Sequence, residues 1–131
     1  MSSNITIIGN LTRDPELTFL NNGSPSVKLG VAVNKRWQNR KTQEWEEKTS
    51  FFNVVCYGKL ADNVSTSLPK GTRVVVSGRL EQRDWLTESG EKRSVIEIIA
   101  DDIGASLNSA HVSITRNAAS VTAGTSEEYA F

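Results

Sequence analysis

Apolar residues alternate with other residues along most of this chain, and this period of two restricts the fold more than any other feature. Val27, Leu29, Val31 and Val33 alternate strictly, as in a half-buried β-strand. Between residues 73 and 85 one parity is apolar and the other is largely polar and basic, which predicts a long strand with one face in a core. These patterns predict an all-β protein.

The remaining segments complete the pattern of a small barrel. Further strands are predicted at residues 4–11, continued at 16–20 after an Asp-Pro break, and at 51–57 and 93–99. Leu60, Ala61, Val64 and Leu68 follow a helical spacing, which predicts one short helix that ends before Pro-Lys-Gly. The order strand, strand, strand, helix, strand, strand is that of the OB-fold, a five-stranded Greek-key barrel with a helix between its third and fourth strands.

Three segments lie outside the barrel pattern. Residues 38–49 are polar and charged apart from Trp45, and we expect either a long mobile loop or an exposed hairpin. Residues 111–115 alternate weakly and fit one extra strand. Residues 117–126 are small and polar, and they cannot bury enough apolar surface to offset the entropy of ordering, so we expect disorder there.

Several classes of function find no support in the sequence. The 131 residues suffice for one domain, and no apolar run is long enough to span a membrane. The N-terminus lacks the basic start and apolar stretch of a secretory signal, so we expect a cytoplasmic protein. Cys56 is the only cysteine and alternates inward with Val54, which predicts an inert buried thiol although a nucleophilic pair with His111 is formally open. We expect no enzyme activity, cofactor or metal.

The charge is balanced overall but uneven along the chain. Fifteen basic and fifteen acidic residues give a formal net charge of zero, which by itself argues against a simple electrostatic binder of nucleic acid. Residues 28–41 nevertheless contain five cations and no acid, whereas the acids gather elsewhere. One face of a neutral protein can therefore be positive.

Aromatic rings are interleaved with cations from residue 35 to residue 85. A ring can stack on any nucleobase and a neighbouring cation can neutralise a phosphate, so this pattern predicts single-strand binding without sequence preference. We predict that Phe52 is a core residue and that Trp45 anchors a loop, with contact to nucleic acid as the alternative for Trp45. The predicted stacking residues are Trp37, Phe51, Tyr57 and Trp85, and the predicted phosphate contacts are Lys35, Arg36, Arg40, Lys59, Arg79, Arg83 and Arg93.

An ordered set of short motifs resembles the bacterial single-stranded DNA-binding proteins over roughly residues 3–115. The later motifs, Gly-Glu-Lys-Arg at 90–93 and Asp-Ile-Gly-Ala-Ser-Leu at 102–107, look like the actinobacterial branch of that family. The earlier motifs are Ile-Gly-Asn-Leu at 8–11, Asp-Pro-Glu at 14–16, Asn-Gly at 22–23, Val-Val-Cys-Tyr-Gly-Lys-Leu-Ala at 54–61, Lys-Gly at 70–71, Ser-Gly-Arg-Leu at 77–80, Trp85 and Ser-Gly at 89–90.

The resemblance implies an OB-fold homotetramer that wraps single-stranded DNA, with the family's stacking rings at Trp37, Phe51, Tyr57 and Trp85. It implies an OB-fold domain at residues 1–104 and a strand at 105–116 that clamps neighbouring subunits, with its core at 111–116. Residues 117–131 are then a short disordered tail. The family's tail docks replication, repair and recombination proteins, and the matching residues here are Glu127, Glu128 and Phe131.

Three alternatives remain open from the sequence. The first is a barrel that binds RNA, since nothing in the chain recognises or rejects a 2′-hydroxyl explicitly. The same aromatic residues could contact a protein partner. The chain could also be a dimeric adaptor of the same fold that loads a replication enzyme.

Overall fold

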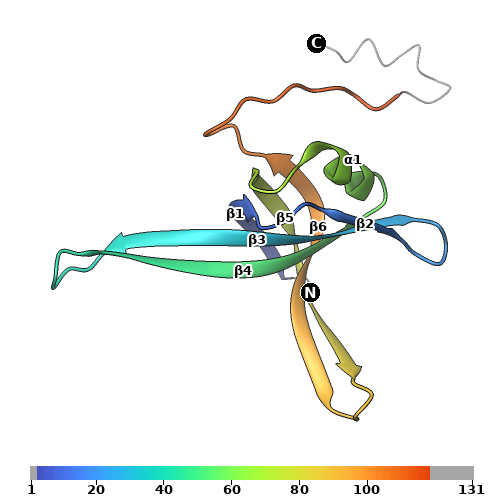
Figure 1. Cartoon of the computed structure of the whole chain (residues 1–131), viewed down its shortest axis with the longest axis horizontal. Coiled ribbons are helices and arrows are strands. Elements are labelled where there is room, and N and C mark those ends of the chain that lie inside the picture. The colour runs from blue at the N-terminus through green and yellow to red at the C-terminus, as the bar shows by residue number, and fades with distance from the viewer. Residues whose placement is uncertain (1–2, 119–131) are drawn as a thin grey trace.

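The computed structural model describes residues 3–118 and contains six strands and one helix in that range (Figure 1). The sheet order is β1-β5-β6-β4-β3-β2, and an additional pairing of β1 with β3 closes the sheet into a barrel. Only two residue pairs join β4 to β6, and this pair of strands is parallel. The elements are β1 (Asn4–Leu11), β2 (Glu16–Phe19), β3 (Pro25–Gln38), β4 (Trp45–Tyr57), α1 (Lys59–Ser67), β5 (Arg73–Leu86) and β6 (Lys92–Ala105).

The predicted OB-fold is confirmed, with one difference in how its strands are counted. The predicted first strand is two strands, β1 and β2, because Pro15 has no backbone N–H to donate to a ladder. Asp14 instead turns toward the loop after α1, where its Oδ1 accepts a hydrogen bond of 2.7 Å from the Lys70 N–H. The helix consequently lies between the fourth and fifth of six strands rather than between the third and fourth of five.

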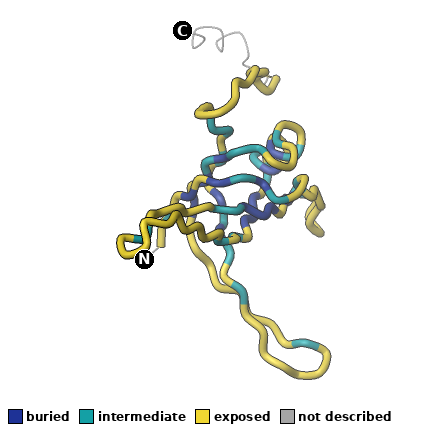
Figure 2. The backbone as a smooth tube through the Cα atoms, turned by 60° about the vertical axis from the view of Figure 1, so that its left-hand side comes forward, coloured by how far each residue is buried: buried dark blue, intermediate teal, exposed yellow. Residues whose placement is uncertain are grey.

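Buried residues gather inside the barrel, while β3, β4 and β5 are exposed at the end that extends into a long hairpin (Figure 2). The interior is filled by the apolar parity that the sequence predicted, and α1 closes one end with Ala61 and Val64. Phe52 packs against this core, as predicted. Aliphatic residues dominate the fully buried set, which is Leu29, Ile98, Val27, Val31, Val54, Val74, Val76 and Cys56.

Glycine permits a close approach of strands at one bend of the barrel. At Gly78 the pairing of β5 with β6 shifts by one residue, which leaves Asp101 as an extra residue in β6. A Cβ atom at Gly78 would collide with the Ile99 carbonyl oxygen, so the bulge needs a residue without a side chain. The bulge bends the β5–β6 pair away from the barrel.

Two hairpins extend well beyond the closed part of the barrel (Figure 1). The pairing of β1 with β3 ends at Ala32, and the pairing of β1 with β5 ends at Arg79. We call the free parts the β3–β4 arm (residues 33–50) and the β5–β6 arm (residues 80–97). The sequence left open whether residues 38–49 form a loop or a hairpin, and the structure has the hairpin, with β3 paired to β4 as far as Gln38 and Trp45.

The segment after β6 runs past α1 without joining a strand in the described residues. Asn63 of α1 and Asn117 exchange two side-chain hydrogen bonds, of 2.9 and 3.1 Å. The strand expected at 111–116 is not formed within this single chain. A clamp would form it against another subunit, so the clamp stays a prediction. The expectation of disorder at 117–126 falls mostly on residues outside the described range.

Candidate nucleic-acid interface

Three of the four predicted stacking residues lie on one outer face of the barrel and its arms. Phe51 and Tyr57 share a parity on β4, and the opposite parity there, at Val54 and Cys56, faces the core. The exposed fractions are 73% for Phe51, 47% for Tyr57 and 42% for Trp85. Rings this exposed contribute little to the core, so their faces are available to a ligand.

Two adjoining hollows connect Trp85 with Tyr57 across the barrel. One has a volume of about 230 Å³ and is lined by Trp85 and Asn53 among others, and the second has about 250 Å³ and is lined by Tyr57 and Thr18 among others. Their shared lining residues are Lys28, Val55, Arg83 and Glu97. The hollows therefore form one groove with a ring at each end and two cations between them.

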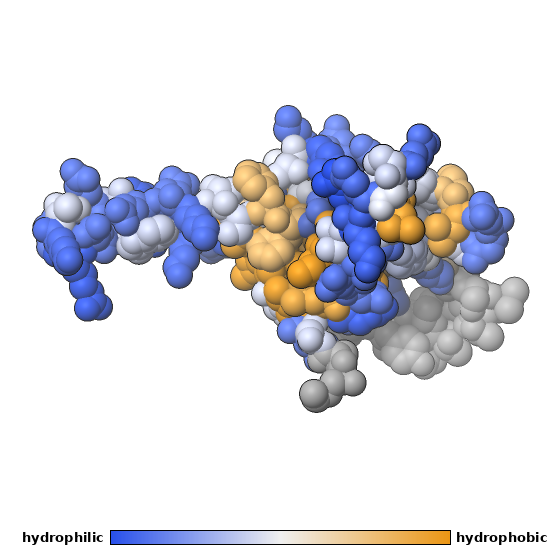
Figure 3. Space-filling view, turned by 90° about the horizontal axis from the view of Figure 1, so that it is seen from below, coloured by the Kyte–Doolittle hydropathy of each residue, from blue (hydrophilic) through white to orange (hydrophobic). Residues whose placement is uncertain are grey.

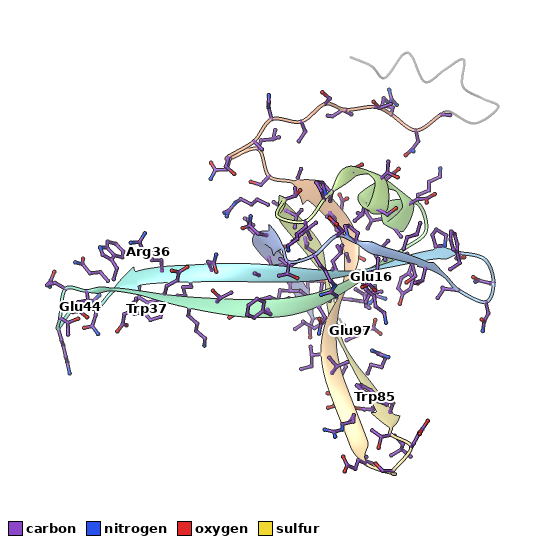
Figure 4. All side chains as sticks on the ribbon, viewed as in Figure 1. Glu16, Arg36, Trp37, Glu44, Trp85 and Glu97 are labelled. Carbon is purple, nitrogen blue, oxygen red and sulfur yellow. The ribbon has the colours of Figure 1, made fainter. Side chains whose placement is uncertain are left out.

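Arg83 occupies the middle of this groove and has two partners. Its guanidinium lies 5.2 Å from the centre of the Trp85 ring, and its Nε lies 3.3 Å from Oε1 of Glu97. The Glu97 side chain is only 12% exposed, at the junction of the β5–β6 arm with the barrel (Figure 4). Arg83 thus orients toward the stacking ring while a carboxylate balances its charge.

The other predicted arginines of β5 and β6 are also held by carboxylates. Arg79 lies 3.5 Å from Glu81 and 3.6 Å from Asp101, and Arg93 lies 2.8 Å from Glu91. These pairs are solvent-exposed, and exposed ion pairs contribute only about 0–1 kcal/mol. A phosphate can therefore compete for each arginine.

Trp37 is separated from the other three rings by the register of the β3–β4 arm. Trp37 pairs with Glu46 and Ala32 pairs with Phe51. Opposed residues share a face and parity alternates, so Trp37 and Phe51 project from opposite faces of the arm. The four predicted rings therefore do not form one continuous row.

The face that carries Trp37 places two like charges opposite each other. Lys35 lies directly opposite Lys48, and both line a hollow of about 400 Å³ with Trp37 and Ser50. Like charges directly opposite each other destabilise a two-stranded ribbon. An anion placed between the two lysines would relieve this repulsion, which makes the site suited to a phosphate.

The remaining predicted cations lie apart from the groove. Arg40 is exposed in the turn of the β3–β4 arm, and Lys59 is exposed at the start of α1. Arg36 lies on the arm with its guanidinium 4.9 Å from the centre of the Trp45 ring. Seen from below, the β3–β4 arm is mostly hydrophilic, and hydrophobic side chains gather where the arms leave the barrel (Figure 3).

Sequence reasoning missed three charged residues at these sites. Lys28 and Glu97 line the groove, and Lys48 faces Lys35. The outward parity of Lys28 on a strand with apolar neighbours was a usable signal. Glu97 had no such signal, because its place in the groove depends on the β4–β6 pairing between residues far apart in sequence.

Cys56 and His111, the two residues of the formally open nucleophilic pair, lie in different surroundings. Burial raises the pKa of the Cys56 thiol to about 11, so the thiol stays protonated near neutral pH. His111 is exposed in the segment after β6. Within residues 3–118 no group of three potential metal ligands gathers. No helix in that part of the chain is long and apolar enough to cross a membrane.

Comparison with known proteins agrees with this geometry. The model of the single-strand binding protein family matches residues 2–106. A single-stranded DNA-binding protein of Paenarthrobacter aurescens is 46% identical over 113 residues, which are 86% of this chain and 66% of that protein. One of Corynebacterium glutamicum is 44% identical over 115 residues, which are 87% of this chain and 51% of that protein. The chain thus spans about half to two thirds of the length of these relatives.

Solved structures give the same result. A small single-stranded DNA-binding protein of Streptomyces coelicolor superposes with a TM-score of 0.66 at 38% identity, covering 81% of this chain and 95% of that one. A Plasmodium falciparum SSB in complex with single-stranded DNA superposes with a TM-score of 0.71 at 30% identity, covering 80% of this chain and 93% of that one. The resemblance found in the sequence is confirmed, and the chain belongs to the single-strand binding protein family.

Proposed function

We propose that this protein binds single-stranded DNA without sequence preference and protects it during replication, recombination, repair or DNA uptake. The observation that carries the proposal is the groove that joins Trp85 to Tyr57 through Lys28 and Arg83. Bases stack on the rings, phosphates meet the cations, and condensed counterions are released. The relative solved with bound single-stranded DNA supports this choice of ligand.

Stacking and phosphate contact have separate roles in this mechanism. Stacking on Phe51, Tyr57 and Trp85 requires unpaired bases, so duplex DNA is excluded. It reads no base edges, so any sequence is accepted. A coated strand cannot fold into hairpins or re-anneal, so occupancy itself is the activity, and no catalytic step is needed.

The test is a tryptophan-fluorescence titration with oligo-dT at two salt concentrations, beside a duplex of the same length and an RNA oligomer of matching sequence. Quenching by the single-stranded DNA alone, with affinity that falls as salt rises, supports the proposal. A clear preference for RNA would instead indicate the RNA-binding alternative. Absence of both quenching and binding would indicate a barrel whose ligand is a protein.

The assembly we propose is a homotetramer in which residues 111–116 clamp a neighbouring subunit. Val112 and Ile114 are exposed in the isolated chain, and Leu107 and Ile8 are exposed apolar residues as well. Several barrels on one particle would bind the same strand with a gain in effective concentration. Light scattering should give four times the chain mass of 14.4 kDa, and a mass of twice that value would favour the dimeric adaptor.

Two further expectations depend on this function. A protein that coats DNA works where the DNA is, so we place it in the cytoplasm at the nucleoid. Glu127, Glu128 and Phe131 lie outside the described residues, and their contact with replication and repair proteins stays a prediction. Loss of pull-down of such proteins on removal of Phe131, with DNA binding intact, would support it.

A further inference from the structure

Trp45 lies on the same face of the β3–β4 arm as Phe51. On β4 the two residues are six positions apart and share a parity, and their partners on β3 are Gln38 and Ala32. At about 3.3 Å per residue the two rings are separated by roughly 20 Å along the strand. The β4 face that carries Asn53 in the groove therefore continues outward through Phe51 to Trp45, turning gradually with the right-handed twist of the ribbon.

The Trp45 ring is exposed, and a cation lies over one of its faces. Its exposed fraction is 60%, and the Arg36 guanidinium lies 4.9 Å from the ring centre. A cation over one face of an indole restrains the ring and leaves the second face open. Between Trp45 and Phe51 the same face carries a hydrogen bond of 2.7 Å from Thr49 to Asn34.

We propose that Trp45 is a further base-stacking platform, engaged by single strands long enough to run from Phe51 along the β3–β4 arm. This inference rests on the proposed function and extends its site. A stacked strand advances about 3.4 Å per nucleotide, so roughly six nucleotides or fewer separate the two rings. Short strands occupy the groove alone, and longer strands reach Trp45.

The charges around Trp45 indicate that it acts by stacking rather than by phosphate attraction. Glu47 lies directly opposite Arg36 on this face, and Glu46 and Glu44 are close in sequence. Figure 4 places Arg36 and Glu44 near the outer end of the arm. These three acids lower the positive potential around Arg36 without forming an ion pair with it in the described residues. Loss of Trp45 should therefore weaken binding without changing its salt dependence.

The direct experiment uses a protein in which Trp45 is the only tryptophan, made by Trp37→Phe and Trp85→Phe, which both keep a stacking ring. Its emission should be quenched by oligo-dT of roughly 32 nucleotides, twice the largest site of a single OB-fold, and hardly at all by one of about 4 nucleotides, which is too short to reach from Phe51 to Trp45. Binding of both oligomers is followed in parallel by anisotropy of a label on the DNA. Binding of the long strand without quenching would overturn the proposal.

A second experiment compares Trp45→Ala with Trp45→Phe in the otherwise unchanged protein. Trp45→Ala should weaken binding of the long strand by about fivefold or more and leave the short strand unaffected, with an unchanged salt slope. Trp45→Phe should retain most of the affinity. An equal effect on both lengths, or a changed oligomeric mass with unchanged affinity, would refute the stacking role. Failure of the unmodified protein to bind either strand would refute the proposed function instead.

Discussion

The two arms carry the same kind of arginine–tryptophan pair in opposite electrostatic settings. The β3–β4 arm has five cations and three acids, and the β5–β6 arm has three cations and five acids. In the β5–β6 arm Arg83 and Arg93 are each paired with a carboxylate. Among the described residues no cation of the β3–β4 arm forms an ion pair. Charge attraction should therefore come mainly from the β3–β4 arm, and positioned stacking from the β5–β6 arm.

The largest effect should follow loss of the positioned ring. We expect Trp85→Ala to weaken single-strand binding by about 1–3 kcal/mol, because a base then loses its stacking partner. Stability should change little, since the ring is exposed and outside the core. Titration of labelled oligo-dT measures the affinity, and thermal unfolding measures the stability.

Leu86→Ala is the matched control for Trp85→Ala. Leu86 is the adjacent residue on β5, it is exposed, and it projects from the opposite face of the same arm. We expect its truncation to leave the affinity unchanged. Comparable losses for both variants would mean that the arm contributes through its shape and not through the Trp85 ring.

The barrel was predictable from sequence and the arms were only partly so, for a physical reason. Val27, Leu29 and Val31 alternate because one side of β3 faces a dry core. Beyond Val33 both faces of the β3–β4 arm meet water, so hydrophobic alternation no longer marks the strand. Cross-strand pairing and the turn at residues 39–44 maintain the arm there.

The candidate site was also only partly predictable from the sequence. The rings and most of the cations were predictable, because they are exposed residue types at strand parity. The separation of Trp37 from Phe51 depends on the register of β3 against β4, and the place of Glu97 depends on the parallel pairing of Val55 with Ile99. Neither register is encoded in a local pattern. The outline of the site could therefore be predicted, while its division into two faces could not.

A second prediction concerns salt dependence. Lys35→Gln should lower the slope of log affinity against log salt by about 0.7, because each single-strand phosphate contact contributes roughly that amount. Arg93→Gln should lower it less, because Glu91 already balances the charge of Arg93. Titrations at four or more salt concentrations give both slopes. Equal decreases of the two slopes would contradict the proposal that charge attraction comes mainly from the β3–β4 arm.

Lys48→Gln tests the same phosphate contact at the residue that faces Lys35. Lys48 lies opposite Lys35, so its replacement should lower the slope by a similar amount. It should also relieve the like-charge repulsion across the arm and leave the free protein slightly more stable. A destabilised protein would indicate that the two lysines are held by an interaction other than repulsion.

The third prediction concerns a substitution that should increase the salt dependence of binding instead of lowering it. Glu97→Gln should release Arg83 from its carboxylate partner and raise the salt slope by about 0.7, with tighter binding at low salt. Glutamine keeps the shape of the side chain, so the packing at the root of the arm is preserved. Weaker binding with an unchanged slope would mean that Glu97 serves chiefly to orient Arg83 against Trp85.

The smallest effect should be a local loss of stability, and it concerns a hairpin turn that contains a residue with positive φ. The β5–β6 turn has Gly90 at φ 84°, and the β3–β4 turn has Gln43 at φ 62°. Gly90→Ala places a side chain in the left-handed region, which costs about 1–2 kcal/mol. No atom lies within 4 Å of a Cβ built there, so the cost is backbone strain alone.

This strain should open the β5–β6 arm rather than unfold the barrel, because local openings need less free energy than global unfolding. The bonds at risk are those from the Thr87 N–H to Glu91 and from the Gly90 N–H to Thr87. Hydrogen exchange of these amides should accelerate about fivefold or more in Gly90→Ala, and exchange at Val74 and Val76 should not change. Acceleration throughout the barrel would mean that the arm and the core unfold as one unit, and the two arms could then not be treated as separate binding elements.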